Sequence, residues 1–271
     1  MSALFNGDSA GALAQSRGLH FGDGVFRTIL IWNGQSLDWS LHLEKLSSDC
    51  AALQLKIPSL DLLRAEADQL AQGHQRAVLK ILVTRQSEGR GYRSTTEESD
   101  RLLLLQPAPR YPEAHWTQGI CAFKSPLQLA PQPALAGVKH LNRLEQVLAS
   151  RQWPMGMDEG ILCNQVGQPV CGTRSNLFWV KNGVIHTPAL NQCGVAGMMR
   201  GKIMRLNDQH QINKSLVMKD WETLLNADEI FVCNSLIGIW PVRQLEQKQW
   251  LVPGPITRSL QEHLGHPRLC E

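Results

Sequence analysis

A lysine at the start of a predicted helix is the residue of this chain best suited to covalent chemistry. Lys139 stands just before apolar residues at helical spacing, which predict an amphipathic helix from about 142 to 153. Residues 131–137 are rich in Pro, Ala and Gly and indicate a loop before it. Burial at the mouth of a helix would lower the pKa of the amine, and a neutral amine can form a Schiff base with an aldehyde. A solvated surface lysine is the competing interpretation.

A second feature could bind an anion. Gly197 precedes a predicted helix over 198–207, and a glycine there allows an unusual backbone angle. The first N–H groups of a helix have no partner within it, and the helix dipole favours negative charge there. The amides near Met198 and Met199 are therefore candidates for phosphate binding.

Composition excludes several other classes of protein. The net charge of +3 gives no case for nucleic-acid binding, and no apolar run is long enough to span a membrane. The seven cysteines are odd in number and none forms a Cys-x-x-Cys pair, so reduced thiols are expected, with no metal site. The motifs of serine hydrolases and nucleotide-binding loops are absent from the sequence. Residues 1–7 lack the pattern of a signal peptide, so we expect a cytoplasmic protein.

These residues must be positioned by a mixture of strands and helices. Three prolines between residues 107 and 112 mark a linker, which divides the chain into a smaller α/β domain over 1–106 and a larger domain over 113–271. The order of elements has no regular βαβ period, and this predicts an α+β fold. Strands are expected at 26–32, 77–84, 102–106, 120–123, 159–163, 176–180, 184–186 and 229–233. Helices are expected at 40–54, 60–72, 142–153, 198–207, 220–225 and 257–264.

Three stretches together resemble a known family. They are Phe-Gly-Asp-Gly-Val-Phe at 21–26, Lys-His-Leu-Asn-Arg-Leu-Glu-Gln at 139–146, and a long signature over 171–200 that includes Asn-Leu-Phe at 176–178 and Val-Ala-Gly-Met-Met-Arg at 195–200. They resemble the fold-type IV enzymes that use pyridoxal 5'-phosphate (PLP), a group that contains aminodeoxychorismate lyases and the D-amino-acid and branched-chain aminotransferases. The lysine stretch resembles the lyases, because aminotransferases usually continue into a Gly-rich stretch with tyrosine.

The resemblance implies roles for individual residues. Lys139 would hold PLP and act as the base, and Thr28 would help in the proton transfer. Lys45 stands where the family usually has an arginine that contacts the cofactor phosphate, and a lysine there is a point charge without the bidentate fork. Ser235 aligns with a phosphate-binding hydroxyl, although a serine there can also bond the backbone of its own turn.

The resemblance also suggests how the substrate is bound. Arg90 and Tyr92 match an Arg-Gly-Tyr loop that lies beside the substrate in the lyases, and both are candidates to bind its carboxylate groups. A solvated hairpin tip is the competing interpretation. Arg27 stands where many relatives have an acidic residue, so it is assigned no role.

One position departs from the family pattern. Cys171 occupies the place of a glutamate that normally keeps the pyridine nitrogen of PLP protonated, and a thiol is at best a weak partner for that nitrogen. Transamination depends strongly on the protonated ring. An elimination that ends in an aromatic ring has its own driving force, so the departure favours a lyase.

The activity that the resemblance implies is the conversion of 4-amino-4-deoxychorismate to 4-aminobenzoate and pyruvate in folate biosynthesis. A D-amino-acid or branched-chain aminotransferase is the first alternative, and a non-catalytic PLP binder is the second. The expected partners are a small-molecule substrate and a second copy of the chain, because relatives are homodimers.

Overall fold

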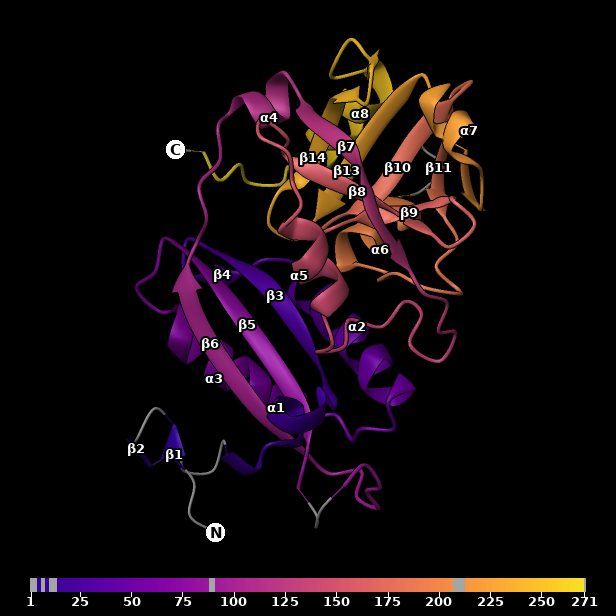
Figure 1. The fold of residues 1–271 in the computed structure, drawn as a ribbon. Helices are drawn as coiled ribbons and strands as arrows, with labels where there is room; N and C mark the ends of the chain where they lie inside the picture. The colour runs from indigo at the N-terminus through magenta and orange to yellow at the C-terminus, as the bar shows by residue number, and fades with distance from the viewer. Residues whose placement is uncertain (1–3, 6–7, 10–13, 88–90, 207–212, 271) are drawn as a thin grey trace. The chain divides into compact units, whose positions relative to one another are not determined.

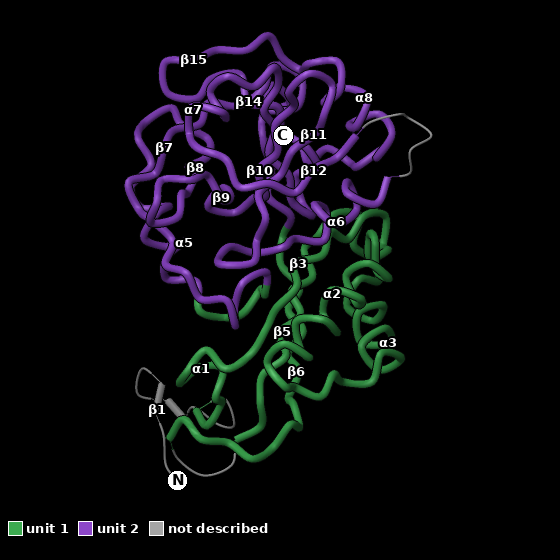
Figure 2. The backbone as a smooth tube through the Cα atoms, turned by 90° about the vertical axis from the view of Figure 1, so that its right-hand side faces the viewer, with its two compact units in different colours: residues 1–107, 138–142 green, residues 108–137, 143–271 purple. Residues whose placement is uncertain are grey.

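The computed structural model describes residues 4–5, 8–9, 14–87, 91–206 and 213–270. Helices and strands are mixed along the chain, which confirms the predicted α+β fold (Figure 1). The chain forms two compact units, and Figure 2 shows them in different colours. The first unit contains residues 1–107 and 138–142, and the second contains 108–137 and 143–271. No helix in the described ranges is both long and apolar enough to cross a bilayer.

The first unit is built on a four-stranded antiparallel sheet with strand order β4-β3-β5-β6. Its main strands are β3 (Gly24–Trp32), β4 (Gln35–Ser36), β5 (Arg76–Arg85) and β6 (Ser99–Pro107). Its helices are α1 (Arg17–Phe21), α2 (Trp39–Ala52) and α3 (Leu60–Ala71). A separate pair of short strands, β1 (Leu4–Phe5) and β2 (Asp8–Ser9), precedes them.

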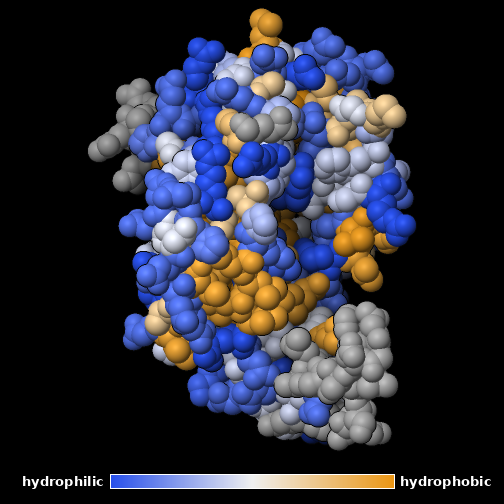
Figure 3. Space-filling model, turned by 90° about the vertical axis from the view of Figure 1, so that its left-hand side faces the viewer, coloured by the Kyte–Doolittle hydropathy of each residue, from blue (hydrophilic) through white to orange (hydrophobic). Residues whose placement is uncertain are grey.

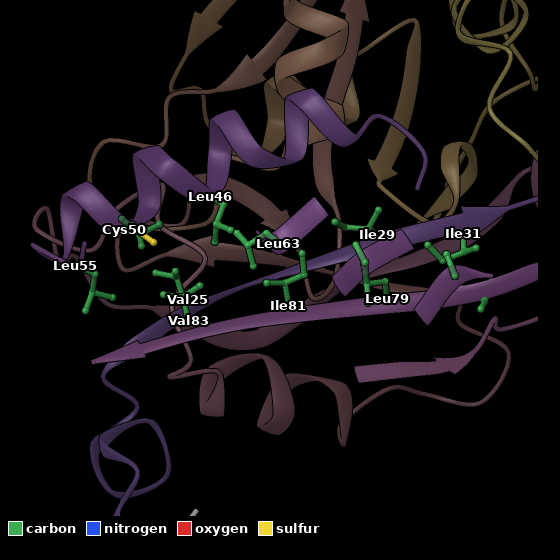
Figure 4. Packing of buried hydrophobic residues seen from close by; sticks show 14 residues of the cluster. Val25, Ile29, Ile31, Leu46, Cys50, Leu55, Leu63, Leu79, Ile81 and Val83 are labelled. Atoms are coloured by element: carbon green, nitrogen blue, oxygen red, sulfur yellow. The ribbon is translucent and has the colours of Figure 1, made fainter. Parts of the chain in front are cut away.

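The core of this unit lies between one face of the sheet and helices α2 and α3. Alternate side chains of a strand point to opposite faces, so β3 sends Val25, Ile29 and Ile31 into this core. Figure 4 shows these side chains packed with Leu46 of α2 and Leu63 of α3. The same alternation places Arg27 on the helix side of the sheet, and Phe26 and Thr28 on the opposite face.

The second unit is built on a nine-stranded sheet whose strands β9 and β10 also pair, which closes six of the strands into a barrel. The strand order is β12-β11-β10-β13-β14-β7-β8-β9, with β15 paired to β14. The bounds are β7 (Ile120–Leu129), β8 (Glu159–Asn164), β9 (Pro169–Gly172), β10 (Asn176–Lys181), β11 (Val184–Pro188), β12 (Lys214–Val217), β13 (Glu229–Asn234), β14 (Gly238–Leu245) and β15 (Lys248–Gln249).

Helices cover this sheet at several places. They are α4 (Ala114–Thr117), α5 (Leu144–Ser150), α6 (Met198–Arg205), α7 (Trp221–Leu225) and α8 (Pro255–Leu264). Phe178 of β10 and Phe231 of β13 stack at the centre of one core cluster, with ring centroids 5.0 Å apart. Met199 and Ile203 of α6 pack on the same cluster, and this fixes the helix against the sheet.

The helix predicted after the lysine is shorter than expected. Helix α5 begins at Leu144 and ends at Ser150, so the expected bounds of 142 and 153 are wrong. Residues 138–142 instead run beside β3, where Val25 and His140 form an antiparallel bridge. Strand pairing takes these backbone groups, so they are not available to a helix. Strand β14 was not expected from the sequence at all.

Candidate active site

Lys139 is held by its backbone against the first residues of strand β3. Its carbonyl oxygen accepts a hydrogen bond from the N–H of Phe26 (3.0 Å), and its own N–H donates to Asp49 Oδ2 (3.3 Å). The next peptide is fixed as well, because the N–H of Leu141 donates to the carbonyl of Gly24 (2.9 Å). The lysine side chain therefore leaves a backbone that is bonded on both sides.

The Lys139 amine lies over an aromatic ring. Its Nζ is 4.4 Å from the centroid of the Phe26 ring, and Nζ of Lys80 is 4.9 Å from the same centroid. Thr28 is two residues along β3 from Phe26 and pairs with Lys80 across the sheet, so Phe26, Thr28 and Lys80 share one face of the sheet. The Lys139 amine lies on the same face, over the Phe26 ring. The half-buried Lys139, the Thr28 hydroxyl and the Lys80 ammonium are groups of the chemical types that can act as a base, carry a proton and bind an anion.

Lys80 is a functional candidate that the sequence analysis missed. It interrupts the apolar strand of residues 77–83, whose core face carries Leu79 and Ile81. A lysine within such an apolar strand was the signal available in the sequence. By itself that signal cannot be distinguished from an exposed lysine on a solvated face.

Lys45 of helix α2 belongs to a group of charges that includes Asp49 of the same helix and Arg27 of strand β3. Its Nζ donates to Oδ1 of Asp49, one turn further along the helix, while Arg27 donates to Oδ2 of the same carboxylate. Asp49 and Arg27 are only 1% and 2% exposed, and the Lys45 side chain is 20% exposed. Burial lowers the pKa of the Arg27 guanidinium, and the adjacent Asp49 carboxylate opposes that shift.

The loop that carries Tyr92 is anchored by a buried arginine that the sequence did not single out. Arg17 donates to the carbonyls of Gly91 and Tyr92 (2.9 Å each) and forms an ion pair with Asp23 (2.9 Å). The Tyr92 side chain itself is 87% exposed, with its ring 5.3 Å from that of Phe21. Arg90 lies outside the described residues.

In the second unit, the start of helix α6 is fixed by Asn176. Its Nδ2 donates to the carbonyl of Val195 (2.7 Å), and its Oδ1 accepts from the N–H of Gly197 (3.0 Å). Gly197 precedes the helix in ordinary extended geometry, so the unusual backbone angle that a glycine allows is not adopted here. A Cβ at Gly197 would lie 2.4 Å from Asn176 Oδ1, and this close approach is what requires glycine.

Met198 and Met199 form the first turn of α6, and no side chain caps this helix. The first N–H groups of α6 thus have neither a carbonyl partner within the helix nor a capping side chain. Both methionine side chains are buried, so each residue offers its backbone to a ligand. This arrangement of donors suits a phosphate group.

Ser235 begins the turn between β13 and β14. The turn is closed by the preceding residue, because Asn234 Oδ1 accepts from the N–H groups of Leu236 (2.9 Å) and Ile237 (3.0 Å). Asn234 thus has the turn-closing role that a serine could have taken. The half-buried Ser235 remains a candidate for phosphate binding.

Cys171 lies on β9, opposite Asn176 of β10, and is 6% exposed. It packs in an apolar cluster with Leu162, Val170 and Cys193. Burial, followed by the nearby Cys193 and Glu159, raises the pKa of the Cys171 thiol well above its ordinary value. The side chain is therefore a neutral thiol at neutral pH.

Glu159 is a buried carboxylate near Cys171 that the sequence analysis did not identify. It accepts hydrogen bonds from the N–H of Gly160 (3.0 Å), the N–H and hydroxyl of Thr173 (2.9 and 2.6 Å), and the hydroxyl of Ser175 (2.7 Å). These bonds hold the turn between Cys171 and Asn176. Glu159 therefore has a structural role, because it holds the first residues of the signature over 171–200 in place.

Each unit, taken by itself, offers groups that suit a part of PLP. The first unit provides the Lys139 amine for an aldehyde and the Lys45 ammonium for a phosphate, and the second provides the uncapped N–H groups of α6. These donors fit the chemical groups of PLP. In the described part of the chain, no cluster of three or more His, Cys, Asp or Glu side chains could hold a metal ion.

Comparison with known proteins agrees with this chemistry. The chain is 32% identical to an aminodeoxychorismate lyase from Vibrio harveyi, over 92% of this chain and 94% of the relative. It also superposes on the crystal structure of 4-amino-4-deoxychorismate lyase from Pseudomonas aeruginosa with a TM-score of 0.85 and 39% identity, covering 92% of this chain and 93% of that one.

A more distant structure shares the fold. It is the branched-chain amino acid aminotransferase of Escherichia coli, with a TM-score of 0.81 at 24% identity, covering 98% of this chain and 94% of that chain. The family described as amino-transferase class IV matches residues 24–245, which include the lysine and the long signature over 171–200. The chain belongs to the class IV aminotransferase family, whose members depend on PLP.

Proposed function

We propose that this protein is a PLP-dependent lyase that converts 4-amino-4-deoxychorismate to 4-aminobenzoate and pyruvate, a step of folate biosynthesis. The observation that carries the proposal is the similarity to two such lyases, at 32% and 39% identity over 92% of the chain. The aminotransferase structure at 24% identity supports a common fold only. The Lys139 amine beside Phe26 supplies the nucleophile and base that this reaction requires.

When bound, PLP supplies an electron sink for the carbon that loses a proton. Lys139 would hold the cofactor aldehyde through its Nζ, and the same amine would take the proton from the ring carbon that carries the substrate amine. The C–O bond to the enolpyruvyl group breaks as the ring becomes aromatic. The released enolpyruvate takes up one proton and becomes pyruvate. We propose that the Thr28 hydroxyl, on the face of β3 that carries Phe26, helps to move these protons.

We propose that the cofactor phosphate is bound by the residues already described. Lys45 contributes an ammonium, Met198 and Met199 contribute backbone N–H groups, and Ser235 contributes a hydroxyl. Cys171 is proposed to face the pyridine nitrogen as a neutral thiol. Such a thiol leaves the pyridine ring a weaker electron sink. The lyase reaction can proceed with a weaker sink, because the formation of an aromatic product drives it.

The substrate carries two carboxylate groups, and the first unit offers cations for them. Lys80 lies on the same aromatic ring as Lys139, so its ammonium is within reach of a substrate bound there. Arg90 and Tyr92 are proposed to contribute from the loop that Arg17 anchors. These cations would also keep the substrate anion from leaving before proton transfer.

We infer that the enzyme acts as a homodimer in the cytoplasm. Helix α5 exposes the apolar residues Leu144, Val147 and Leu148 by 73%, 50% and 49%. On the face of the molecule drawn in Figure 3, hydrophobic side chains gather in one area of the surface. A second copy of the chain would cover such side chains. All seven cysteines are free, which suits a reducing compartment. Sedimentation at twice the chain mass would support the dimer.

The proposed activity is tested by separating lyase from aminotransferase products. The wild-type protein with PLP should release pyruvate and 4-aminobenzoate from 4-amino-4-deoxychorismate without any added keto acid. Amino transfer that requires a keto acid, with no 4-aminobenzoate formed, would identify an aminotransferase instead. Binding of PLP with neither lyase nor aminotransferase turnover would identify the non-catalytic binder.

A further inference from the structure

The buried carboxylate of Asp49 contacts both lysines that the proposed function assigns to the cofactor, Lys45 through its ammonium and Lys139 through its backbone. It accepts from the Lys45 ammonium and, at 3.3 Å, from the backbone N–H of Lys139. It also accepts from the guanidinium of Arg27, whose Nε donates to the carbonyl of Phe26 (2.8 Å). All of these residues belong to the first unit.

Stability alone does not account for this arrangement. Asp49 and Arg27 are 1% and 2% exposed, so both charges have lost nearly all contact with water. Removing two charges from water costs about as much as their attraction returns, and apolar replacements of buried ion pairs are often equally stable. A buried pair placed against the backbone of Lys139 therefore suggests a role in the site.

The geometry gives Asp49 control over the Lys139 peptide. The backbone N–H of Lys139 donates to Asp49, and the backbone carbonyl of Lys139 accepts from the N–H of Phe26 (3.0 Å). Only the side chain of Lys139 remains to be placed, and its Nζ lies over the ring of Phe26, at 4.4 Å from the centroid. The carboxylate thus fixes the point from which the cofactor-bearing side chain starts.

Asp49 also orients Lys45. An ammonium on a four-carbon stem has three donors and no preferred direction, whereas the planar fork of an arginine is pre-organised. The bond to Asp49 uses one donor and ties the Lys45 stem to helix α2, one turn away. The direction of the Lys45 ammonium is therefore set by Asp49.

We propose that Asp49 is a positioning residue for the cofactor, which fixes the Lys139 backbone and orients the Lys45 ammonium toward the phosphate, while Arg27 balances its charge. This inference rests on the proposed function, because it requires PLP as the ligand. It explains how a lysine at position 45 serves where a bidentate arginine would be expected.

The test compares the binding of PLP with that of pyridoxal, which has the aldehyde but no phosphate. The dissociation constant of pyridoxal divided by that of PLP, both measured by absorbance titration of the full chain, reports the phosphate contacts. Lys45→Met calibrates the loss of one such contact, which should lower this ratio about tenfold. Asp49→Asn should lower the ratio by a similar factor although Lys45 is still present.

A second variant separates positioning from folding. Arg27→Met/Asp49→Leu removes both buried charges and fills their space, so its melting temperature should stay near that of the wild type. Its ratio should nevertheless fall about tenfold. Glu66→Gln is the matched control, because it breaks an ion pair with Arg101 in the same unit, between α3 and β6, and should leave the ratio unchanged.

Two results would overturn the inference and leave the proposed function intact. An unchanged ratio in the double variant would show that Asp49 has a structural role only. A higher ratio would show that Asp49 competes with the phosphate for Lys45. If the wild-type protein binds neither aldehyde, both the inference and the proposed function fail.

Discussion

Phe26 contacts Lys139 twice, through its backbone and through its ring. Its N–H donates to the carbonyl of Lys139 (3.0 Å), and its ring centroid lies 4.4 Å from Lys139 Nζ. One residue of β3 thus sets both where the lysine leaves the backbone and where its amine ends. This relationship is local to the first unit.

The ring of Phe26 should matter for catalysis. Phe26→Leu keeps the backbone bond but removes the aromatic face, so the amine samples more orientations, and kcat/KM should fall about tenfold. Steady-state assays of 4-aminobenzoate formation measure the effect. Trp32→Leu is the control, because it removes another aromatic ring of the same strand that contacts a cation. The Cζ of Arg76 lies 4.9 Å from the centroid of the Trp32 ring. Equal losses in both variants would mean that the strand is damaged in general.

Arg17 should affect binding of the substrate more than the chemical step. Arg17→Met removes the donors that hold the carbonyls of Gly91 and Tyr92, so the loop loses its fixed position. We expect KM to rise about tenfold with a smaller change in kcat. This is the result when a lost contact had stabilised the bound substrate and the transition state equally. Arg64→Met, which breaks the exposed pair with Asp68, should change neither constant. A fall in kcat alone would contradict the assignment.

Two glycines of the α6 region should respond oppositely to alanine. Gly197→Ala places a Cβ 2.4 Å from Asn176 Oδ1, so the first turn of α6 must move and PLP should bind at least about tenfold more weakly. A Cβ at Gly201, within the same helix, meets no atom within 4 Å, so Gly201→Ala should stabilise the protein by up to about 1 kcal/mol. Thermal unfolding and cofactor titration measure both. Unchanged PLP affinity in Gly197→Ala would argue against a phosphate at this turn.

Cys171→Glu tests the position that departs from the family pattern. The new carboxylate would be buried in the cluster of Leu162 and Val170, so the protein without cofactor should melt at a lower temperature. With PLP, the carboxylate should change the visible spectrum of the cofactor by favouring the protonated ring. An unchanged spectrum together with an unchanged lyase rate would show that Cys171 does not face the ring.

The fold of the first unit could be predicted from the sequence because local pattern and burial agree there. Strands β3 and β5 and helices α2 and α3 occur within a few residues of their expected bounds. In α5 the same periodicity predicted a longer helix with a buried apolar side, but Leu144, Val147 and Leu148 are exposed in the single chain. A periodic pattern shows that one side is apolar, and it does not show what covers that side.

The candidate site could be predicted only in part. The stretch around Lys139 and the signature over 171–200 could be identified from the sequence, because they resemble the corresponding stretches of a known family. The roles of Asp49 and Arg17 could not be predicted, since a charged residue on a helix is usually solvated. The return of residues 138–142 to the first unit depends on backbone bonds with β3, which leave no side-chain pattern.

The most direct test of the whole account is the identity of the lysine that carries the cofactor. The purified protein is loaded with PLP and reduced with borohydride, and its peptides are analysed by mass spectrometry. The account predicts one modified peptide with the cofactor mass on Lys139. Modification of Lys80 in its place, or of no lysine, would contradict it.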